Sequence, residues 1–499
     1  MEISGKKVTV VGLGRSGLGA ANLLSKLGAD VTITDSKQEG ELTGFREKLN
    51  PSIRLVLGSH PEDIFVSSDM LILSPGVPLA IPPVSKALRK GTPVIGELEL
   101  AYQILSNQIL QLKSEEPATG SQIIPFLAVT GTNGKSTTTS LLNIMLGKGG
   151  FRTILGGNIG NALTEEIYKR IGESENRRTG EVVVSPLHRV TASDLGVDYI
   201  VAEVSSFQLE TIKHFQPKGA VILNITPDHL DRYHSLDEYA EAKVRISENQ
   251  HEGDFLLINA DDPVTIKVIN EKLEINRKKP KLFYFSRKRE VEGIFSRDGK
   301  IYCNFPDLSL IPRHSLLIDA EDIYIKGVHN LENAMAASAM ALLAGSSLDA
   351  VRDSLRTFHG LEHRLEFVRE IVGVTYVNDS KGTNVGAVVK SIESFTNPVI
   401  LIAGGRDKAG DFTLLRSLVK ERVKALVLIG EAREKIKKAL GNFTETLMAA
   451  DLKEAVQISR GIAVKGDIVL LSPACASFDM FTDFEDRGRQ FKKIVMELI

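Results

Sequence analysis

The chain has 499 residues, more than one domain usually holds, so we expect three domains with separate cores. Its 61 basic and 63 acidic side chains nearly cancel, which excludes the broad positive field that nucleic-acid binding needs. No apolar stretch approaches the ~18 residues of a membrane span. The two cysteines, Cys303 and Cys475, are far apart in sequence, which argues against a disulfide framework. We therefore expect a cytoplasmic protein with no membrane insertion and no nucleic-acid partner.

Short β-rich runs alternate with helix-like stretches along the chain, a pattern typical of α/β folds. The first block predicts strands over residues 8–11, 31–34, 53–57 and 70–73, followed by a polar linker at 113–121. The second predicts strands over 126–129, 199–202, 220–225 and 255–258, helices over 137–146 and 333–344, and a polar surface excursion over 173–196. The third predicts strands over 374–377, 398–403, 425–429 and 468–471. We expect α/β domains at residues 1–112, 113–359 and 360–499, with a parallel sheet in the central one.

A first glycine loop, GLGRSG at residues 12–17, follows a predicted strand and opens a helix. Asp35 stands at the end of the next strand, an arrangement that indicates a Rossmann-like dinucleotide-binding domain. Glycines let backbone N–H groups approach any diphosphate, so NAD and a UDP group fit this loop equally well. The turn of Ser74, Pro75 and Gly76, after another strand, adds backbone donors at the same sheet edge. We prefer anion binding to the alternative, a tight turn that only packs helix on strand.

A second glycine loop, TGTNGKS at residues 130–136, lies between a predicted strand and a predicted helix, the context that a P-loop requires. Gly131 and Gly134 permit a wrapped backbone. Lys135 can neutralise β- and γ-phosphate charge, and the Ser136 hydroxyl can bind Mg²⁺. Val129 occupies the position of the usual first glycine, which favours a variant loop over a standard kinase or GTPase.

Two polar residues follow later strands of the same block, where α/β sheets assemble their sites. Glu203 follows the strand at 199–202, and His229 lies in NITPDHLDR at residues 224–232. A carboxylate and an imidazole are groups that a magnesium nucleotide centre can use. Each also has a plain structural interpretation, since Glu203 can cap a helix or face solvent and a single histidine is more often a packed or surface residue. Their shared position favours the functional interpretation.

Several motifs together resemble the Mur ligase family, which also includes folylpolyglutamate synthetase. These motifs are GTNGKS at 131–136, Glu203, DHLDR at 228–232 and HNLEN at 329–333. Two more, NDSKGTN at 378–384 and SPACASFDMF at 472–481 followed by Phe484, are similar to those of the members that add D-glutamate. The resemblance covers all three blocks and implies a P-loop ATPase-like domain between two Rossmann-like domains. It also implies an ATP-dependent ligase of peptidoglycan precursor synthesis, which joins UDP-N-acetylmuramoyl-L-alanine to D-glutamate through an acyl phosphate.

The resemblance assigns each substrate to a set of residues. It implies that the first domain holds the UDP-sugar, with contacts at Arg15, Ser16, Asp35, Ser36, Ser74, Pro75 and Gly76, and at Asn158 of the central domain. It implies ATP contacts in the central domain at Gly131, Thr132, Asn133, Gly134, Lys135, Ser136, Thr137 and Asn333. The third domain is expected to close over ATP with Arg364 and Asp379, and to hold D-glutamate with Lys381, Thr383, Lys408, Ser477, Phe478 and Phe484. We expect the protein to act as a monomer.

The resemblance also implies two Mg²⁺ ions, bound by Ser136, Glu203, His229 and Lys243. Lys243 matches a lysine that CO₂ carbamylates in this family, which turns a cation into an anionic ligand. Positive charge between the γ-phosphate and the attacking carboxylate lowers the barrier because the two anions repel each other. Arg364 is expected to clamp the phosphates. The expected catalytic residues are therefore Lys135, Glu203, His229, Lys243 and Arg364.

Three other functions remain open at this point. An NAD(P)-dependent oxidoreductase would use the first glycine loop and leave Lys135 dispensable, but it does not explain the P-loop. A related ligase that adds L-alanine, a diamino acid or a glutamate to folate would share the ATP chemistry, but the NDSKGTN and C-terminal motifs disfavour it. A nucleotide-binding regulator without activity leaves Glu203, His229 and Lys408 unexplained.

Overall fold

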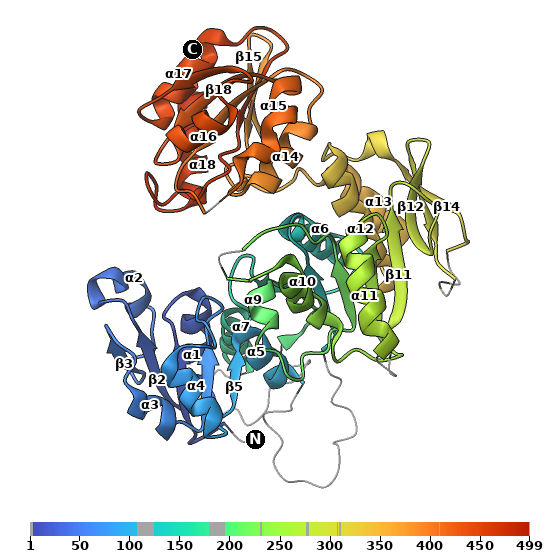
Figure 1. The fold of residues 1–499 in the computed structure, drawn as a ribbon. Coiled ribbons are helices and arrows are strands. Elements are labelled where there is room, and N and C mark those ends of the chain that lie inside the picture. Colours follow the sequence, from blue (N-terminus) through green and yellow to red (C-terminus); the bar gives the residue numbers. More distant parts are fainter. Residues whose placement is uncertain are drawn as a thin grey trace.

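A computed structural model describes residues 3–106, 124–178, 195–229, 232–275, 279–306, 308, 311–408 and 410–498. In this part of the chain the strands form three sheets, which follow one another in sequence order. Figure 1 shows them as three blocks, coloured blue, green to yellow, and orange to red. The predicted division into three α/β domains agrees with this arrangement, while the exact limits at 112 and 359 stay predictions.

The first sheet has the strand order β3-β2-β1-β4-β5, and all of its pairings are parallel. The chain therefore leaves β1 in one direction, through β2 and β3, and returns to its other side with β4. A crevice for ligands opens at such a reversal, beyond the carboxyl ends of the strands. The elements are β1 (Lys7–Val11), α1 (Arg15–Lys26), β2 (Asp30–Asp35), η1 (Glu39–Glu41), α2 (Thr43–Arg46), β3 (Arg54–Leu57), α3 (Glu62–Ser67), β4 (Met70–Leu73), α4 (Pro82–Arg89), β5 (Val94–Gly96) and α5 (Glu97–Leu105).

The central sheet has the order β14-β13-β12-β11-β10-β9-β6-β8-β7. The pairings from β7 to β12 are parallel, and β12, β13 and β14 pair antiparallel. Its elements are β6 (Phe126–Thr130), α6 (Lys135–Lys148), β7 (Thr153–Gly157), α7 (Leu163–Arg178), β8 (Tyr199–Glu203), α9 (Ser206–Leu209), β9 (Gly219–Ile222), α10 (Leu236–Val244), η2 (Arg245–Ser247), β10 (Phe255–Asn259), α11 (Pro263–Ile275), β11 (Lys281–Ser286), β12 (Gly293–Arg297), β13 (Lys300–Asn304), β14 (Ser315–Asp319), η3 (Ala320–Asp322), α12 (Val328–Leu343) and α13 (Leu348–Thr357). Every residue of β6 is buried, as expected for a strand covered on both faces.

The third sheet has the order β15-β16-β20-β17-β18-β19, with β15 antiparallel at one edge. Its elements are β15 (Glu366–Ile371), β16 (Val374–Asn378), α14 (Val385–Glu393), β17 (Val399–Gly404), η4 (Phe412–Leu415), α15 (Arg416–Arg422), β18 (Val423–Ile429), α16 (Arg433–Leu440), β19 (Glu445–Met448), α17 (Leu452–Ile462), β20 (Ile468–Leu471) and α18 (Phe484–Met496). Helix α14 begins where the Asn384 side chain accepts a hydrogen bond from the backbone N–H of Ala387.

The first and central sheets share one hydrophobic core. Buried residues from Val8 of β1 and Leu100 of α5 belong to the same cluster as Phe126 of β6 and Ile258 of β10. Helix α5 is anchored there by Glu99, whose carboxylate accepts hydrogen bonds from the backbone N–H groups of residues 213, 214 and 215 at 2.9–3.0 Å. The third domain has clusters of its own, made of residues between 374 and 495. The first two domains are therefore joined by apolar packing that the third does not share among the described residues.

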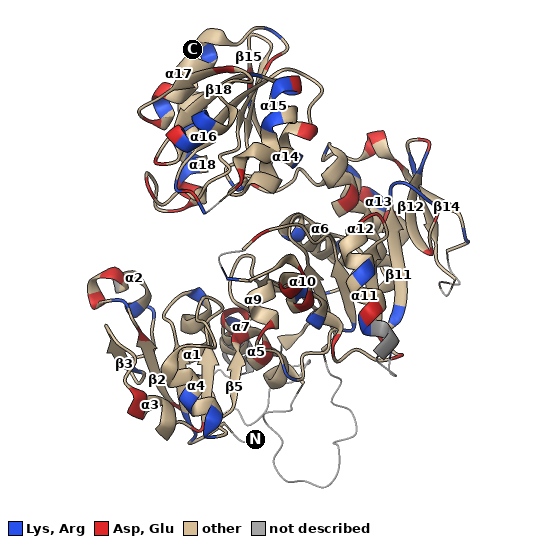
Figure 2. Ribbon diagram, in the orientation of Figure 1, with Lys and Arg blue, Asp and Glu red and all other residues tan. Residues whose placement is uncertain are grey.

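The structure corrects several details of the predictions. The strand expected over 220–225 ends at Ile222, and the central sheet is mixed because β13 and β14 extend it with antiparallel pairings. The excursion expected over 173–196 begins as the last turns of α7, and residues 179–194 lie outside the described part of the chain, as does the linker at 113–121. Basic and acidic side chains are interspersed over all three domains (Figure 2), in keeping with their near-equal numbers. Across the described residues we find no helix with the length and apolar character of a membrane span.

Candidate active site

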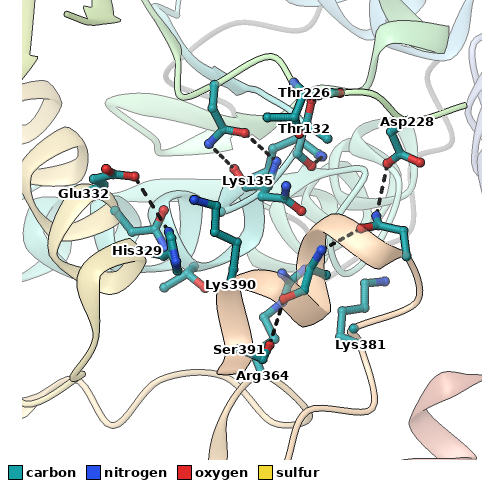
Figure 3. A pocket seen from close by; sticks show the side chains of 18 of the residues that line it. Thr132, Lys135, Thr226, Asp228, His329, Glu332, Arg364, Lys381, Lys390 and Ser391 are labelled. Carbon is teal, nitrogen blue, oxygen red and sulfur yellow. Dashed lines mark hydrogen bonds and ion pairs between the residues drawn. The ribbon is translucent and has the colours of Figure 1, made fainter. Parts of the chain in front are cut away.

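A cavity of about 460 Å³ lies between the P-loop of the central domain and helix α14 of the third domain (Figure 3). Strand ends supply much of its lining, because β6, β8, β9, β10 and β11 of one sheet end at the same edge. The lining contains many of the residues that the sequence singles out, which are Thr132, Asn133, Gly134, Lys135, Thr137, Asn158, Glu203, His229, Asn333, Arg364, Asp379, Lys381, Thr383 and Lys408.

The P-loop wraps from the end of β6 to the start of α6. Gly131 and Gly134 have φ of 151° and 85°, values that residues with a Cβ rarely adopt. Asn224 holds the loop from the next strand, since its Oδ1 accepts from the backbone N–H of Asn133 at 2.9 Å and its Nδ2 donates to the Asn133 carbonyl at 3.1 Å. The loop conformation is thus fixed by hydrogen bonds before any ligand is bound.

Two lysines, the partly buried Lys135 and the buried Lys243, meet at the carbonyl of Gly131. Lys135 Nζ donates to this oxygen at 2.9 Å and to the Thr132 carbonyl at 2.9 Å, while Lys243 Nζ donates to it at 2.8 Å. Burial lowers the pKa of Lys135, an effect that the nearby Glu203 opposes. Burial, reinforced by the charge of Lys135, lowers the pKa of Lys243 well below its usual value. Lys243 is 1% exposed and does not line the cavity.

Glu203, at the end of β8, presents an unused carboxylate oxygen. Its Oε1 accepts from Asn158 Nδ2 at 2.7 Å, but its buried Oε2 has no hydrogen-bond partner. A buried anionic oxygen without a partner is costly, unless a cation or a donor completes the site. Within the described ranges no group of three or more His, Cys, Asp or Glu side chains could hold a metal alone. This donor set fits Mg²⁺, which usually takes one or two protein carboxylates together with phosphate oxygens and water.

His229 stands at the rim of the cavity in a backbone conformation unusual for its type, with φ of 53°. Its Nε2 lies 3.7 Å from Asp228 Oδ2, and its ring packs edge-on against Phe207 with 4.8 Å between centroids. Burial lowers the pKa of His229, opposed by Asp228 and supported by the nearby lysines, including Lys408. The imidazole is therefore neutral at pH 7 and free to act as a ligand.

The third domain reaches the P-loop through Arg364. One guanidinium nitrogen of Arg364 donates to Ser136 Oγ at 2.6 Å, so the hydroxyl expected to bind Mg²⁺ is already engaged. Burial lowers the pKa of Arg364 as well. Farther along the same interface, Asn384 Nδ2 donates to Asp228 Oδ2 at 3.2 Å (Figure 3). These two hydrogen bonds join the central domain to the third domain.

The residues expected to hold D-glutamate are only partly assembled at the cavity. Lys381, Thr383 and Lys408 line it, whereas Ser477, Phe478 and Phe484 do not. Phe484 is nevertheless close, because Lys381 Nζ lies 3.6 Å from its ring centroid. Burial, together with a smaller effect of the charge of Arg364, lowers the pKa of Lys381 to about 8. The side chain of Phe478 is mostly exposed.

The residues expected to bind the UDP-sugar lie at the edge of the first sheet, outside this cavity. Asp35 accepts hydrogen bonds from the backbone N–H groups of Leu13 at 2.7 Å and Lys37 at 2.9 Å, and Ser74 Oγ donates to the Gly12 carbonyl at 2.9 Å. These contacts shape the crevice beside β1 and β4. Arg15 donates to the Gly160 carbonyl at 3.4 Å, which links this edge to the central domain. Ser16 lies in the first turn of α1, Ser36 follows β2, and Pro75 and Gly76 follow β4.

The sequence analysis gave no individual role to several cavity residues, although it quoted some of them within motifs. They are Asn224, Thr226, Asp228, Asn259, Asp261, Asp262, Arg287, Lys288, His329, Asn330, Glu332, Asn384 and Lys390. Most of them follow the ends of β9, β10 and β11, so the strand-end rule that selected Glu203 could have found them. Lys390 carries no such signal, because it lies in the middle of α14.

The fold and the cavity together define a three-domain α/β protein with a P-loop site that the third domain helps to close. Family models describe it further: the Mur ligase MurD-like N-terminal domain matches residues 6–96, the Mur ligase middle domain matches 129–341, and the Mur ligase glutamate ligase domain matches 363–475. The chain belongs to the Mur ligase family, as its motifs indicated.

Curated relatives match the chain from end to end. It is 43% identical over 500 residues to a protein named UDP-N-acetylmuramoylalanine--D-glutamate ligase from Geotalea daltonii, covering 100% of this chain and 99% of that one. A protein of the same name from Caldanaerobacter subterraneus is 42% identical over 504 residues, covering 100% of both.

Solved structures agree in fold. MurF from Acinetobacter baumannii aligns with a TM-score of 0.58 at 15% identity, covering 97% of this chain and 93% of that one. MurC from Thermotoga maritima aligns with a TM-score of 0.55 at 19% identity, covering 98% and 99%. FolC from E. coli, solved with ADP, aligns with a TM-score of 0.54 at 17% identity, covering 85% and 98%.

Proposed function

We propose that this protein is an ATP-dependent ligase that joins D-glutamate to UDP-N-acetylmuramoyl-L-alanine, as a monomer in the cytoplasm. The observation that carries the proposal is the meeting, in one cavity, of a P-loop lysine, a buried carboxylate with an unused oxygen, and cations from a second domain. The end-to-end likeness to relatives with this activity in their names supports the choice of substrates.

The first step is transfer of a phosphoryl group. One oxygen of the muramoyl-alanine carboxylate attacks the γ-phosphorus of ATP, the bond to the bridging oxygen breaks, and ADP leaves an acyl phosphate behind. The proposed role of Lys135 is to neutralise the phosphates as this charge moves, and that of Arg364 is to hold the γ-phosphoryl oxygens beside Ser136. Burial of both cations strengthens their field at the phosphates.

The second step forms the amide bond. The neutral amine of D-glutamate attacks the carbonyl carbon of the acyl phosphate, the carbon–oxygen bond to phosphate breaks, and the proton that the nitrogen loses passes to the departing phosphate. Lys381, Thr383 and Lys408, with the Ser477–Phe478 turn and Phe484, are the proposed holders of the acceptor carboxylates. Lys381 and Lys408 supply two positive charges at the cavity for a substrate that carries two carboxylates.

Divalent cations fit the donors at the P-loop end of the cavity. Glu203 and His229 are the proposed protein ligands, with Ser136 nearby, and Mg²⁺ held there would supply positive charge between the two reacting anions. Lys243 is the proposed carbamate. A lysine must be neutral to react with CO₂, and the lowered pKa of its amine, caused by burial, favours that form.

The remaining proposed roles concern substrate position. Asn158, which donates to Glu203, and the first-domain residues around Gly12 and Ser74 are the proposed contacts of the sugar nucleotide. Asn333 and Asp379 are the proposed nucleotide contacts on the two sides of the cavity. The first glycine loop thus serves a UDP group in this proposal, which removes the need for NAD.

One experiment tests the proposal as a whole. The purified protein is incubated with ATP, Mg²⁺ and UDP-N-acetylmuramoyl-L-alanine, and a panel of amino acids is offered while phosphate release and product mass are measured. We expect product with D-glutamate and none with L-glutamate, L-alanine or a diamino acid. Product with a different amino acid, or phosphate release that needs no acceptor, would overturn the assignment.

A second experiment tests the carbamate. We expect Lys243→Ala to lose activity and short carboxylic acids to restore part of it, because they can replace the missing anionic ligand. Normal activity of the unsupplemented variant would eliminate this role.

A further inference from the structure

Helix α14 turns one face toward the nucleotide end of the cavity. Ala387, Lys390 and Ser391 all line it, and their spacing of three and four residues places them on one side of the helix. The helix lies close to the P-loop, since a methyl group added at Gly386 would be 4.0 Å from the Asn133 side-chain nitrogen. Lys390 supplies the positive charge on this face.

Lys390 is held only loosely. Its Nζ lies 3.8 Å from Glu393 Oε2, and both side chains are 42% exposed. A solvent-exposed pair at this separation contributes little stability, so the ammonium can exchange this partner for a better one at small cost. Glu393 also has a second neighbour, because the same Oε2 lies 3.6 Å from His329 Nε2, a buried nitrogen without a hydrogen bond.

Two other cations near the P-loop, Lys135 and Arg364, already have hydrogen-bond partners. Lys135 donates to two loop carbonyls and Arg364 donates to Ser136. Figure 3 shows the Lys390 side chain extending into the cavity between His329 and Lys135. Because Lys390 and the P-loop line the same cavity, a nucleotide whose terminal phosphate lies at Lys135 would have its inner phosphates within reach of Lys390.

We propose that Lys390 binds the α- and β-phosphates of the nucleotide from the side of the third domain, and that Glu393 holds the lysine when no nucleotide is present. This inference rests on the proposed ATP-binding function and adds a residue to it. A charge-assisted contact to phosphate is shorter and stronger than the present pair, so binding would move the ammonium from Glu393 to the ligand. The Glu393 carboxylate would then keep His329 as its neighbour.

The test measures ADP binding by calorimetry in the presence of Mg²⁺, without turnover. We expect Lys390→Ala to weaken ADP binding about tenfold, the typical effect of losing one charge-assisted hydrogen bond. Adenosine binding should not change in this variant, because adenosine has no phosphate. Lys390→Arg should restore most of the affinity for ADP. Glu393→Gln should tighten ADP binding, since it removes the competing carboxylate, and a purely structural role of the helix would not give this opposite sign.

Lys453→Ala serves as the matched control, because this lysine is exposed on α17 of the same domain and does not line the cavity. Unchanged ADP binding by Lys390→Ala, or an equal loss for ADP and adenosine, would overturn the inference. The outcome is separable from that of the proposed function. If the wild-type protein binds ADP and makes product while Lys390→Ala binds ADP equally well, only the proposed role of Lys390 is refuted.

Discussion

Asp379 is a buried carboxyl group at the seam between α14 and the third sheet. Its Oδ2 accepts hydrogen bonds from Ser391 Oγ at 2.6 Å and Ser472 Oγ at 2.7 Å, and its Oδ1 accepts from the backbone N–H of Leu365 at 3.3 Å. Burial raises the pKa of Asp379 from 3.8 to about 6, although these hydrogen bonds oppose the shift. When the Asp379 carboxylate is charged, its burial therefore lowers the free energy of unfolding.

The sign and size of this cost follow from proton linkage. The folded protein binds the proton more tightly than the unfolded chain, so the free energy of unfolding falls as the pH rises from 3.8 to about 6 and stays low above that. A shift of roughly two units corresponds to about 3 kcal/mol. Asp379→Asn removes this cost, but its amide nitrogen cannot accept the hydrogen bonds that the Ser391 and Ser472 hydroxyls donate to Oδ2, and their rearrangement costs about 1 kcal/mol. We expect the variant to be more stable by about 2 kcal/mol at pH 7.

The assay is hydrogen exchange of the β16 and β20 amides in wild type and Asp379→Asn at pH 7 and at pH 4, after correction for the intrinsic exchange rate. The gain in the free energy of unfolding of the variant should be present at pH 7. It should be absent at pH 4, where the wild-type carboxyl group is protonated. Since Asp379 lines the cavity, the more stable variant should also bind ATP more weakly. A variant that is less stable than wild type at pH 7, or equally stabilised at both pH values, would refute the reasoning.

Three further predictions concern activity. Lys135→Ala should reduce acceptor-dependent phosphate release by about 10²–10³-fold, because the phosphates lose a buried charge, and a wild-type rate would contradict the proposed role. Arg232→Lys should raise the KM for the sugar nucleotide more than it lowers kcat. The guanidinium binds Glu210 through two nitrogens and donates to the Pro75 carbonyl at 3.3 Å, a fork that lysine cannot reproduce; an unchanged KM would count against this link. The KM for D-glutamate should rise above pH 8 as Lys381 loses its proton, and it should stay flat there in Lys381→Arg.

The sequence predicted the parts of the site that depend on short-range chemistry. The P-loop needs two glycines with positive φ followed by a lysine at the start of a helix, and residues 130–136 contain this pattern without long-range information. Glu203 was found because a carboxylate directly after a buried strand lies at the edge where ligands bind. The three-domain α/β fold followed from alternating strands and helices.

Other features depend on contacts between distant residues and left no local pattern. Asn224 makes two hydrogen bonds to Asn133 of the P-loop, which lies 91 positions earlier in the sequence. Helix α14 approaches that loop only because the third domain lies over the central one. The antiparallel strands β13 and β14 were missed because residues 300–319 carry no motif, and their pairing depends on contacts with β12 and with each other. Glu97 and Glu99 of α5 are buried, although charged side chains usually lie at the surface, so residue type alone would not predict their burial.

The common core of the first two domains has a consequence for which molecules fit. Packing fixes the separation between the glycine loop after β1 and the P-loop. In the proposed function, one sugar nucleotide spans this separation with its reactive carboxylate at the P-loop. A precursor with one residue more or fewer on its peptide stem would miss that position by up to about 3.5 Å. In this proposal, the common core of the first two domains therefore limits the length of the sugar nucleotide that fits, independently of the amino acid that is added.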